Sequence, residues 1–186
     1  MSAAEHPTER ALSFARLPER VDGWRVLSIG AGTAGEDYLT SLGAAEFVVL
    51  DRPTEDAGLE TGAFDLAICG SGLETDAHPL ATYAWLRRAL KAEGTLIAGS
   101  MVLPDPARSQ YARFVPAGED GEACRWLPGR LAFRWMVEVS SFDVAGWLGD
   151  GSDGRGDDPA YLQAKAADRA PALDLDRQPI SRWKPK

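Results

Sequence analysis

Short apolar runs separated by polar, helix-forming stretches recur along most of this chain. Four runs share this character: Val26–Ile29, Phe47–Leu50, Leu66–Cys69 and Thr95–Ala98. Unbroken runs of this length are typical of strands buried on both faces of a parallel sheet. Helices are predicted between them, over residues 36–42 and 79–90, the second with its apolar positions along one stripe. The pattern therefore predicts a doubly wound, mostly parallel α/β sheet.

The ends of the chain follow a different pattern. A short helix is expected over residues 8–17, capped by Thr8. Near the other end, a helix whose apolar face is predicted to hold Leu131, Trp135, Val139 and Phe142 precedes two strand candidates. These strands, 143–148 and 160–166, are expected to form a C-terminal antiparallel pair. Nothing marks a domain boundary, so residues 1–186 are interpreted as one domain with flexible tails at 1–7 and 170–186.

A glycine motif follows the first predicted strand. Gly30, Gly32 and Gly35 have G-x-G-x-x-G spacing and open the next helix, and Asp51 ends the second strand. Glycines allow a sharp turn and close approach of backbone to a ligand, a helix N-terminus offers unpaired N–H groups, and an acid at that distance can accept from ribose hydroxyls. Strand, glycine turn, helix, strand and acid in this order predict a nucleotide-like ligand more strongly than the glycines alone.

Composition narrows the possible partners. The chain has 186 residues and a formal net charge of −8, which argues against a broad nucleic-acid footprint. No stretch is long and apolar enough to span a membrane. Two cysteines in no metal-binding or redox spacing, with no recognisable secretory leader, favour a reducing, cytoplasmic setting.

The segment Phe64–Ser100 resembles the fourth- and fifth-strand region of class I S-adenosylmethionine-dependent methyltransferases. The matching phrases are Phe64–Leu66, Leu73–Glu74, Leu86–Lys91 and Gly94–Leu96, within a resemblance that covers roughly residues 21–167. It implies a Rossmann-like methyltransferase fold that uses S-adenosylmethionine. Residues 111–142 also resemble tRNA wobble-uridine methyltransferase relatives. Gly129 and Ser141–Phe142 depart from that pattern, so it suggests topology and not substrate.

The resemblance implies a set of site residues. Those expected to contact the cofactor are Gly30, Ala31, Gly32, Gly35, Asp51, Arg52, Ser71 and Gly72. Glu74 and His78 are candidate general bases, since a base assists transfer to a hydroxyl. His78 fits an ordinary helix entry as well. A substrate pocket suited to an aromatic or anionic ligand is expected from Tyr111, Arg113, Trp126 and Arg130. No metal site is predicted, because the Asp- and Gly-rich run at 149–159 lacks a calcium-loop register.

Four departures from the family pattern keep a second reading open. Residues 52–63 are too short for the usual helix and third strand, so that sheet edge is predicted to be missing. Ser28 stands where many relatives have an acid, and Thr75 where many have histidine. The short segment before the first strand leaves the site either open or covered by a second subunit, as in a homodimer.

The leading hypothesis is a methyltransferase acting on oxygen or nitrogen of a small molecule. The alternative is a catalytically degenerate or repurposed protein of the same fold, serving as a partner subunit or a non-methylating enzyme. A nicotinamide-dependent reductase ranks third, because it leaves the Phe64–Ser100 resemblance unexplained.

Overall fold

A six-stranded sheet forms the centre of the computed structural model, which describes residues 6–51, 60–70, 76, 78–115, 125–149 and 159–168. In sheet order the strands are β2 (Glu46–Leu50), β1 (Arg25–Ile29), β3 (Phe64–Cys69), β4 (Leu90–Ser100), β8 (Ala160–Ala166) and β7 (Phe142–Leu148). The first four run parallel, and β8 is antiparallel to both of its neighbours. The predicted fold class, with its antiparallel closing pair, is confirmed.

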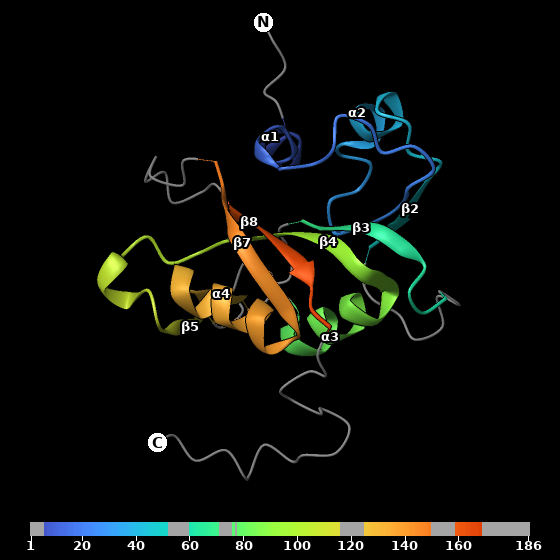
Figure 1. Ribbon diagram of the computed structural model, residues 1–186. Coiled ribbons are helices and arrows are strands. Elements are labelled where there is room, and N and C mark those ends of the chain that lie inside the picture. The colour runs from blue at the N-terminus through green and yellow to red at the C-terminus, as the bar shows by residue number, and fades with distance from the viewer. Residues whose placement is uncertain are drawn as a thin grey trace, which may run out of the picture.

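Two helices cover each face of this sheet (Figure 1). Helices α1 (Pro7–Phe14) and α2 (Glu36–Ser41) lie on one face, and α3 (Pro79–Ala89) and α4 (Arg130–Val139) on the other. Side chains of each strand alternate between the faces. In β1, Leu27 and Ile29 therefore join the core under α3 and α4, while Val26 joins the core under α1.

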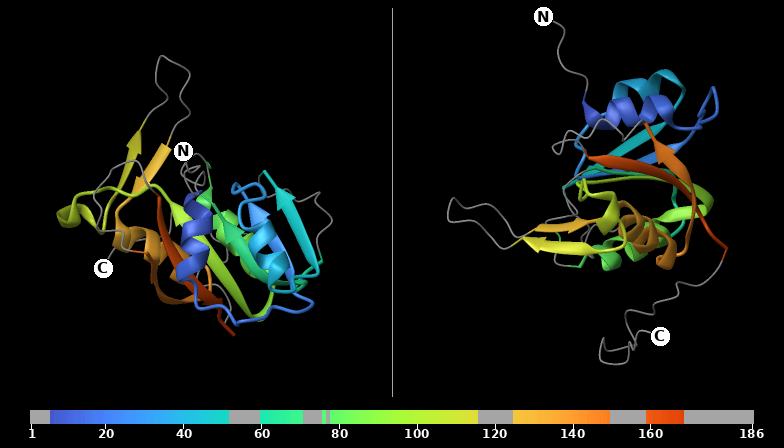
Figure 2. Two further views of the ribbon diagram at one scale, coloured as in Figure 1. Left: turned by 90° about the horizontal axis from the view of Figure 1, so that it is seen from above. Right: turned by 90° about the vertical axis from the view of Figure 1, so that its left-hand side faces the viewer.

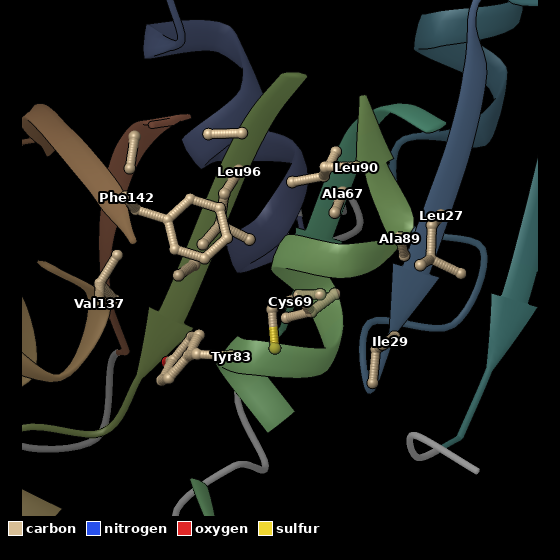
Figure 3. Packing of buried hydrophobic residues seen from close by; sticks show 14 of the residues in the cluster. Leu27, Ile29, Ala67, Cys69, Tyr83, Ala89, Leu90, Leu96, Val137 and Phe142 are labelled. Atoms are coloured by element: carbon tan, nitrogen blue, oxygen red, sulfur yellow. The ribbon is translucent and has the colours of Figure 1, made fainter. Parts of the chain in front are cut away.

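The larger core lies between the sheet and helices α3 and α4. Tyr83 of α3, Phe133 of α4 and Phe142 of β7 are fully buried there. Figure 3 shows the side chains of Leu96 of β4, Phe142, Tyr83 and Cys69 gathered in this core. Burying an aromatic or leucine side chain contributes roughly 1.5–3 kcal/mol. This core therefore contributes strongly to holding the strands that carry the candidate site.

Helix α1 is attached to the sheet at two places. The Thr8 hydroxyl lies 3.0 Å from the Tyr161 hydroxyl, and both groups are buried. Just after the helix, Arg16 N donates to the Gln163 side chain at 2.9 Å. Both partners belong to β8, so this antiparallel strand fixes α1 across the face that also carries the glycine turn.

The segment after β4 contains a second, two-stranded sheet. Strands β5 (Ala112–Val115) and β6 (Arg125–Pro128) form an antiparallel ribbon, which projects away from the main sheet in Figure 2. A short 3-10 helix, η3 (Pro106–Arg108), precedes it. The base of the ribbon is fastened by Leu103 N to Pro128 O at 2.9 Å and by Gly129 N to Tyr111 O. Local composition does not show that residues 112–115 pair with residues 125–128, because a long segment separates the two strands.

Several element boundaries differ from the predictions. Helix α1 begins at Pro7 and is capped by the His6 side chain, not by Thr8. Strand β4 begins at Leu90, because the chain passes through Glu93 in a left-handed conformation and continues in the sheet. Trp85 of α3 is partly buried against the larger core.

The predicted core face of α4 is wrong. Phe133 and Val137 are buried, whereas Leu131 and Trp135 are exposed, Trp135 by 45%. Phe142 is a core residue of β7 and not of the helix. Helical periodicity gives the spacing of a stripe but does not decide which of two competing apolar stripes the sheet covers.

Some of the sequence predictions concern residues outside the described ranges. Strand β2 is the edge of the sheet among the described residues, and 52–59, on which the missing third strand depends, are not among them. Of the predicted tails, residues 1–5 and 170–186 also lie outside, whereas His6 and Pro7 are described and α1 begins at Pro7. An ion pair lies at the amino ends of β1 and β2. Arg25 Nε donates to the Glu46 carboxylate at 2.5 Å, and this hydrogen bond raises the pKa of the Arg25 guanidinium above its ordinary value.

Candidate functional site

Three strands end together beside the predicted glycine motif. Gly30 N donates to Leu50 O at 3.2 Å, and Gly70 N donates to Ile29 O at 2.9 Å. These bonds join the carboxyl ends of β2, β1 and β3. Open α/β sheets place ligands at this edge, and Asp51 and Gly70 follow the two strands on either side of the one that ends before Gly30.

The turn after β1 depends on residues without side chains. Gly30, Gly32 and Gly35 have φ of 63°, 57° and 89°, in the left-handed region that favours glycine. A Cβ added to Gly70 would lie 2.8 Å from Gly30 O and 2.8 Å from the Ala31 Cβ. Gly70, which the motif does not include, is therefore needed for the close approach of β3 to the turn.

Hydrogen bonding in the turn is one-sided. The carbonyls of Ala31, Gly32 and Thr33 each accept a bond, the one on Gly32 from the buried Ser28 hydroxyl at 2.7 Å. Within the described part of the chain, the backbone N–H groups of the same three residues have no partner. Successive free N–H groups around left-handed residues suit an anionic or acceptor group. This donor set fits the carboxylate end of an amino acid, such as the methionine part of S-adenosylmethionine.

Gly35 has a packing function. It is buried, and a Cβ there would collide with Leu12 of α1. The last glycine of the motif thus lets α1 pack onto the turn from above. Gly30 and Gly32 remain exposed.

Asp51 and His78 both lie near this edge, in different settings. Asp51 is exposed directly after β2. His78 is exposed at the start of α3, where Asp76 accepts from His78 N at 2.8 Å and from the Thr82 hydroxyl. They tie the residues that lead into α3 to its first turn, while the N-cap His78 makes no side-chain capping bond. The candidates Arg52, Ser71, Gly72 and Glu74 lie outside the described residues.

The four predicted substrate residues lie around the ribbon and the start of α4. Strand β7 runs parallel to β4, since both are antiparallel to β8. Helix α4 therefore begins at the same carboxyl edge as the glycine turn, and Arg130 lies there with its guanidinium 4.4 Å from the Trp147 ring centroid. Tyr111, Arg113 and Trp126 are exposed, Tyr111 by 58% and Trp126 by 41%.

Sequence reasoning missed two aromatic partners here. Phe114 pairs across the ribbon with Trp126, their ring centroids 5.0 Å apart. Trp147 provides the surface on which Arg130 stacks. No local pattern pairs residues 112–115 with 125–128 or links positions 130 and 147, so the sequence offered no signal for either contact.

The same arrangement of strands and helices is found in solved structures. The chain has the fold of S-adenosylmethionine-dependent methyltransferases. It is similar to 1,6-didemethyltoxoflavin-N1-methyltransferase from Burkholderia thailandensis, solved with 1,6-didemethyltoxoflavin and S-adenosylhomocysteine bound, at 14% identity and a TM-score of 0.68. The match covers 88% of this chain and 80% of that one. A match to an S-adenosylmethionine-dependent methyltransferase from Mesorhizobium loti has 17% identity, a TM-score of 0.59 and coverage of 88% and 98%.

One similar structure has a different activity. The 4+2 cyclase SpnF matches at 14% identity and a TM-score of 0.56, over 86% of this chain and 80% of that one. No protein-family model matches the chain, and no curated protein matches it. The likeness therefore establishes the fold, while the kinship to wobble-uridine enzymes stays a prediction.

The described residues contain neither a cluster of metal ligands nor a helix that could span a membrane. No group of three or more His, Cys, Asp or Glu side chains could hold a metal ion. None of the helices described there has the length and apolar character needed to cross a bilayer.

Proposed function

We propose that this protein is an S-adenosylmethionine-dependent methyltransferase that acts on oxygen or nitrogen of a small molecule in the cytoplasm. The proposal rests on the turn at residues 31–33, which lies at the carboxyl edge of the sheet. Its backbone carbonyls accept hydrogen bonds, whereas its backbone N–H groups are free among the described residues. The similar methyltransferases support the choice of cofactor.

The cofactor-binding roles follow from this arrangement. The backbone of Gly30, Ala31 and Gly32 would hold the methionine end, and Asp51 would accept from the ribose hydroxyls. Arg52, Ser71 and Gly72 are proposed to complete the site. Gly35 would contribute by letting α1 pack, not by touching the ligand. When bound, the cofactor supplies an electrophilic methyl group.

The acceptor side is proposed to lie between α3 and the ribbon. Methyl transfer depends mainly on alignment, which aromatic faces at Tyr111 and Trp126 would provide for a planar acceptor. Arg113 and Arg130 would favour an anionic group on it. Glu74 or His78 would take the proton of a hydroxyl or amine acceptor.

Calorimetry tests the cofactor assignment directly. Wild-type protein should bind S-adenosylmethionine and S-adenosylhomocysteine with micromolar affinity, and Asp51→Ala should lose most of it, because the ribose hydroxyls lose their acceptor. NADH serves as the control ligand and should give no heat of binding. Absence of binding at millimolar S-adenosylhomocysteine would refute the proposal.

The second candidate is a repurposed protein of this fold that binds the cofactor without transferring its methyl group. The likeness to a cyclase favours it. Mass spectrometry of S-adenosylmethionine incubated with the protein and a panel of phenols, amines and heteroaromatic acids separates the two. Accumulation of S-adenosylhomocysteine with a methylated acceptor identifies the transferase, and tight binding without turnover across the panel favours the second candidate.

A further inference from the structure

We propose that Ser28 is a positioning residue for the cofactor, because its hydroxyl holds the Gly32 carbonyl against β1 and leaves the neighbouring N–H groups to the ligand. This inference rests on the proposed function and concerns a residue that would not itself touch the cofactor. It gives a reason for a serine at a buried position in a strand whose neighbours are apolar.

The position of Ser28 leaves its side chain one role among the described residues. It is fully buried, and its backbone pairs with Val49 on one side and Ile68 on the other. Because Leu27 and Ile29 face the larger core, Ser28 faces the opposite side, under the turn that leads to α2. Its hydroxyl donates to Gly32 O at 2.7 Å.

The hydrogen bond from Ser28 controls the orientation of the Gly32 peptide. A carbonyl turned toward the strand cannot occupy the ligand side of the turn, where an acceptor would repel a carboxylate. The carbonyls of Ala31 and Thr33 are bonded within the turn by Ala34 N and Glu36 N, at 3.2 and 2.9 Å. Among these three carbonyls, that of Gly32 depends on a side chain, so substitution of Ser28 is the change that can release it.

Position 28 requires a short side chain that can donate a hydrogen bond. Alanine has no hydroxyl, and an aspartate at neutral pH only accepts hydrogen bonds. In Ser28→Asp, the new carboxylate would lie against the Gly32 carbonyl in a buried space, with two acceptors facing each other. We therefore expect that Ser28→Asp weakens cofactor binding at least as much as Ser28→Ala does, although an acid would add charge near the cofactor.

Titration with S-adenosylhomocysteine by calorimetry tests the assignment. Ser28→Ala should weaken binding about threefold to tenfold, the effect of one net hydrogen bond. Ser140→Ala is the matched control, since Ser140 is also buried and donates to a backbone carbonyl, that of Met136, at 2.9 Å. It should lose similar stability and keep wild-type affinity.

A second measurement needs no ligand. Order parameters from ¹⁵N relaxation should fall at Ala31, Gly32 and Thr33 in Ser28→Ala, from about 0.85 for rigid backbone, and stay unchanged there in Ser140→Ala. Wild-type affinity in Ser28→Ala, or an equally rigid turn, overturns the inference. If the wild-type protein binds no S-adenosylhomocysteine, the proposed function fails, while the relaxation data still decide whether Ser28 orders the turn.

Discussion

At the carboxyl edge of the sheet, backbone segments approach each other so closely that single positions cannot accept a side chain. A side chain at Gly70 would meet the Gly30 carbonyl and Ala31 at 2.8 Å, and neither can move without shifting the turn. We expect Gly70→Ala to cost about 1–3 kcal/mol in the free energy of unfolding, as overpacking does, and to weaken S-adenosylhomocysteine binding.

The matched control for Gly70 is Gly146→Ala in β7. A Cβ there meets nothing within 4 Å. Its effect on urea unfolding should stay within roughly 0.5 kcal/mol, the usual range for an unconstrained surface substitution. Equal losses at the two glycines would contradict the close approach between β3 and the turn.

A second residue-scale prediction concerns the junction of α4 and β7. Ser141 has φ of 70° and a buried hydroxyl that lacks a hydrogen-bond partner among the described residues. Glycine relieves both costs, so Ser141→Gly should raise the free energy of unfolding by about 1 kcal/mol. Ser140→Gly, which removes a hydrogen-bonded hydroxyl, should lower it. Chemical denaturation measures both, and destabilisation by Ser141→Gly would contradict the strain.

Among the elements, α1 supports the site without forming its surface. Leu12 is 1% exposed and lies against Gly35, whereas Phe14 of the same helix is 56% exposed. Leu12→Ala should cost about 2–5 kcal/mol, as buried leucines do, and should weaken S-adenosylhomocysteine binding through the turn. Phe14→Ala deletes a larger side chain and should cost less than roughly 1 kcal/mol. Thermal unfolding with calorimetry tests the pair, and the opposite ranking would show that α1 does not dock as described.

At the scale of the whole molecule, cofactor binding and folding should be coupled, because the turn exists only in the folded sheet. S-adenosylhomocysteine at 100 times its dissociation constant should stabilise the protein by about 2.7 kcal/mol. Differential scanning fluorimetry should show a concentration-dependent rise in Tm for the wild type and a much smaller rise for Asp51→Ala. An equal rise in both would remove Asp51 from the site.

The fold was largely predictable because its strands are buried on both faces, and this leaves continuous apolar runs in the sequence. The glycine turn was predictable because left-handed φ values require glycine at Gly30 and Gly32. The ribbon β5–β6 and the buried face of α4 were not, since pairing across residues 116–124 and the choice between Phe133 and Trp135 depend on contacts with distant elements.

The sequence by itself therefore determined the strands of the main sheet and the helices between them, the position of the glycine turn and the acid that follows the second strand, because each depends on local spacing and backbone preference. The tertiary structure alone decided that Gly35 packs beneath Leu12, that Gly70 belongs with the turn and that Ser28 bonds to Gly32. These contacts join residues whose neighbours in space are set by the packing of α1 and β3 on β1, and no local pattern encodes that packing.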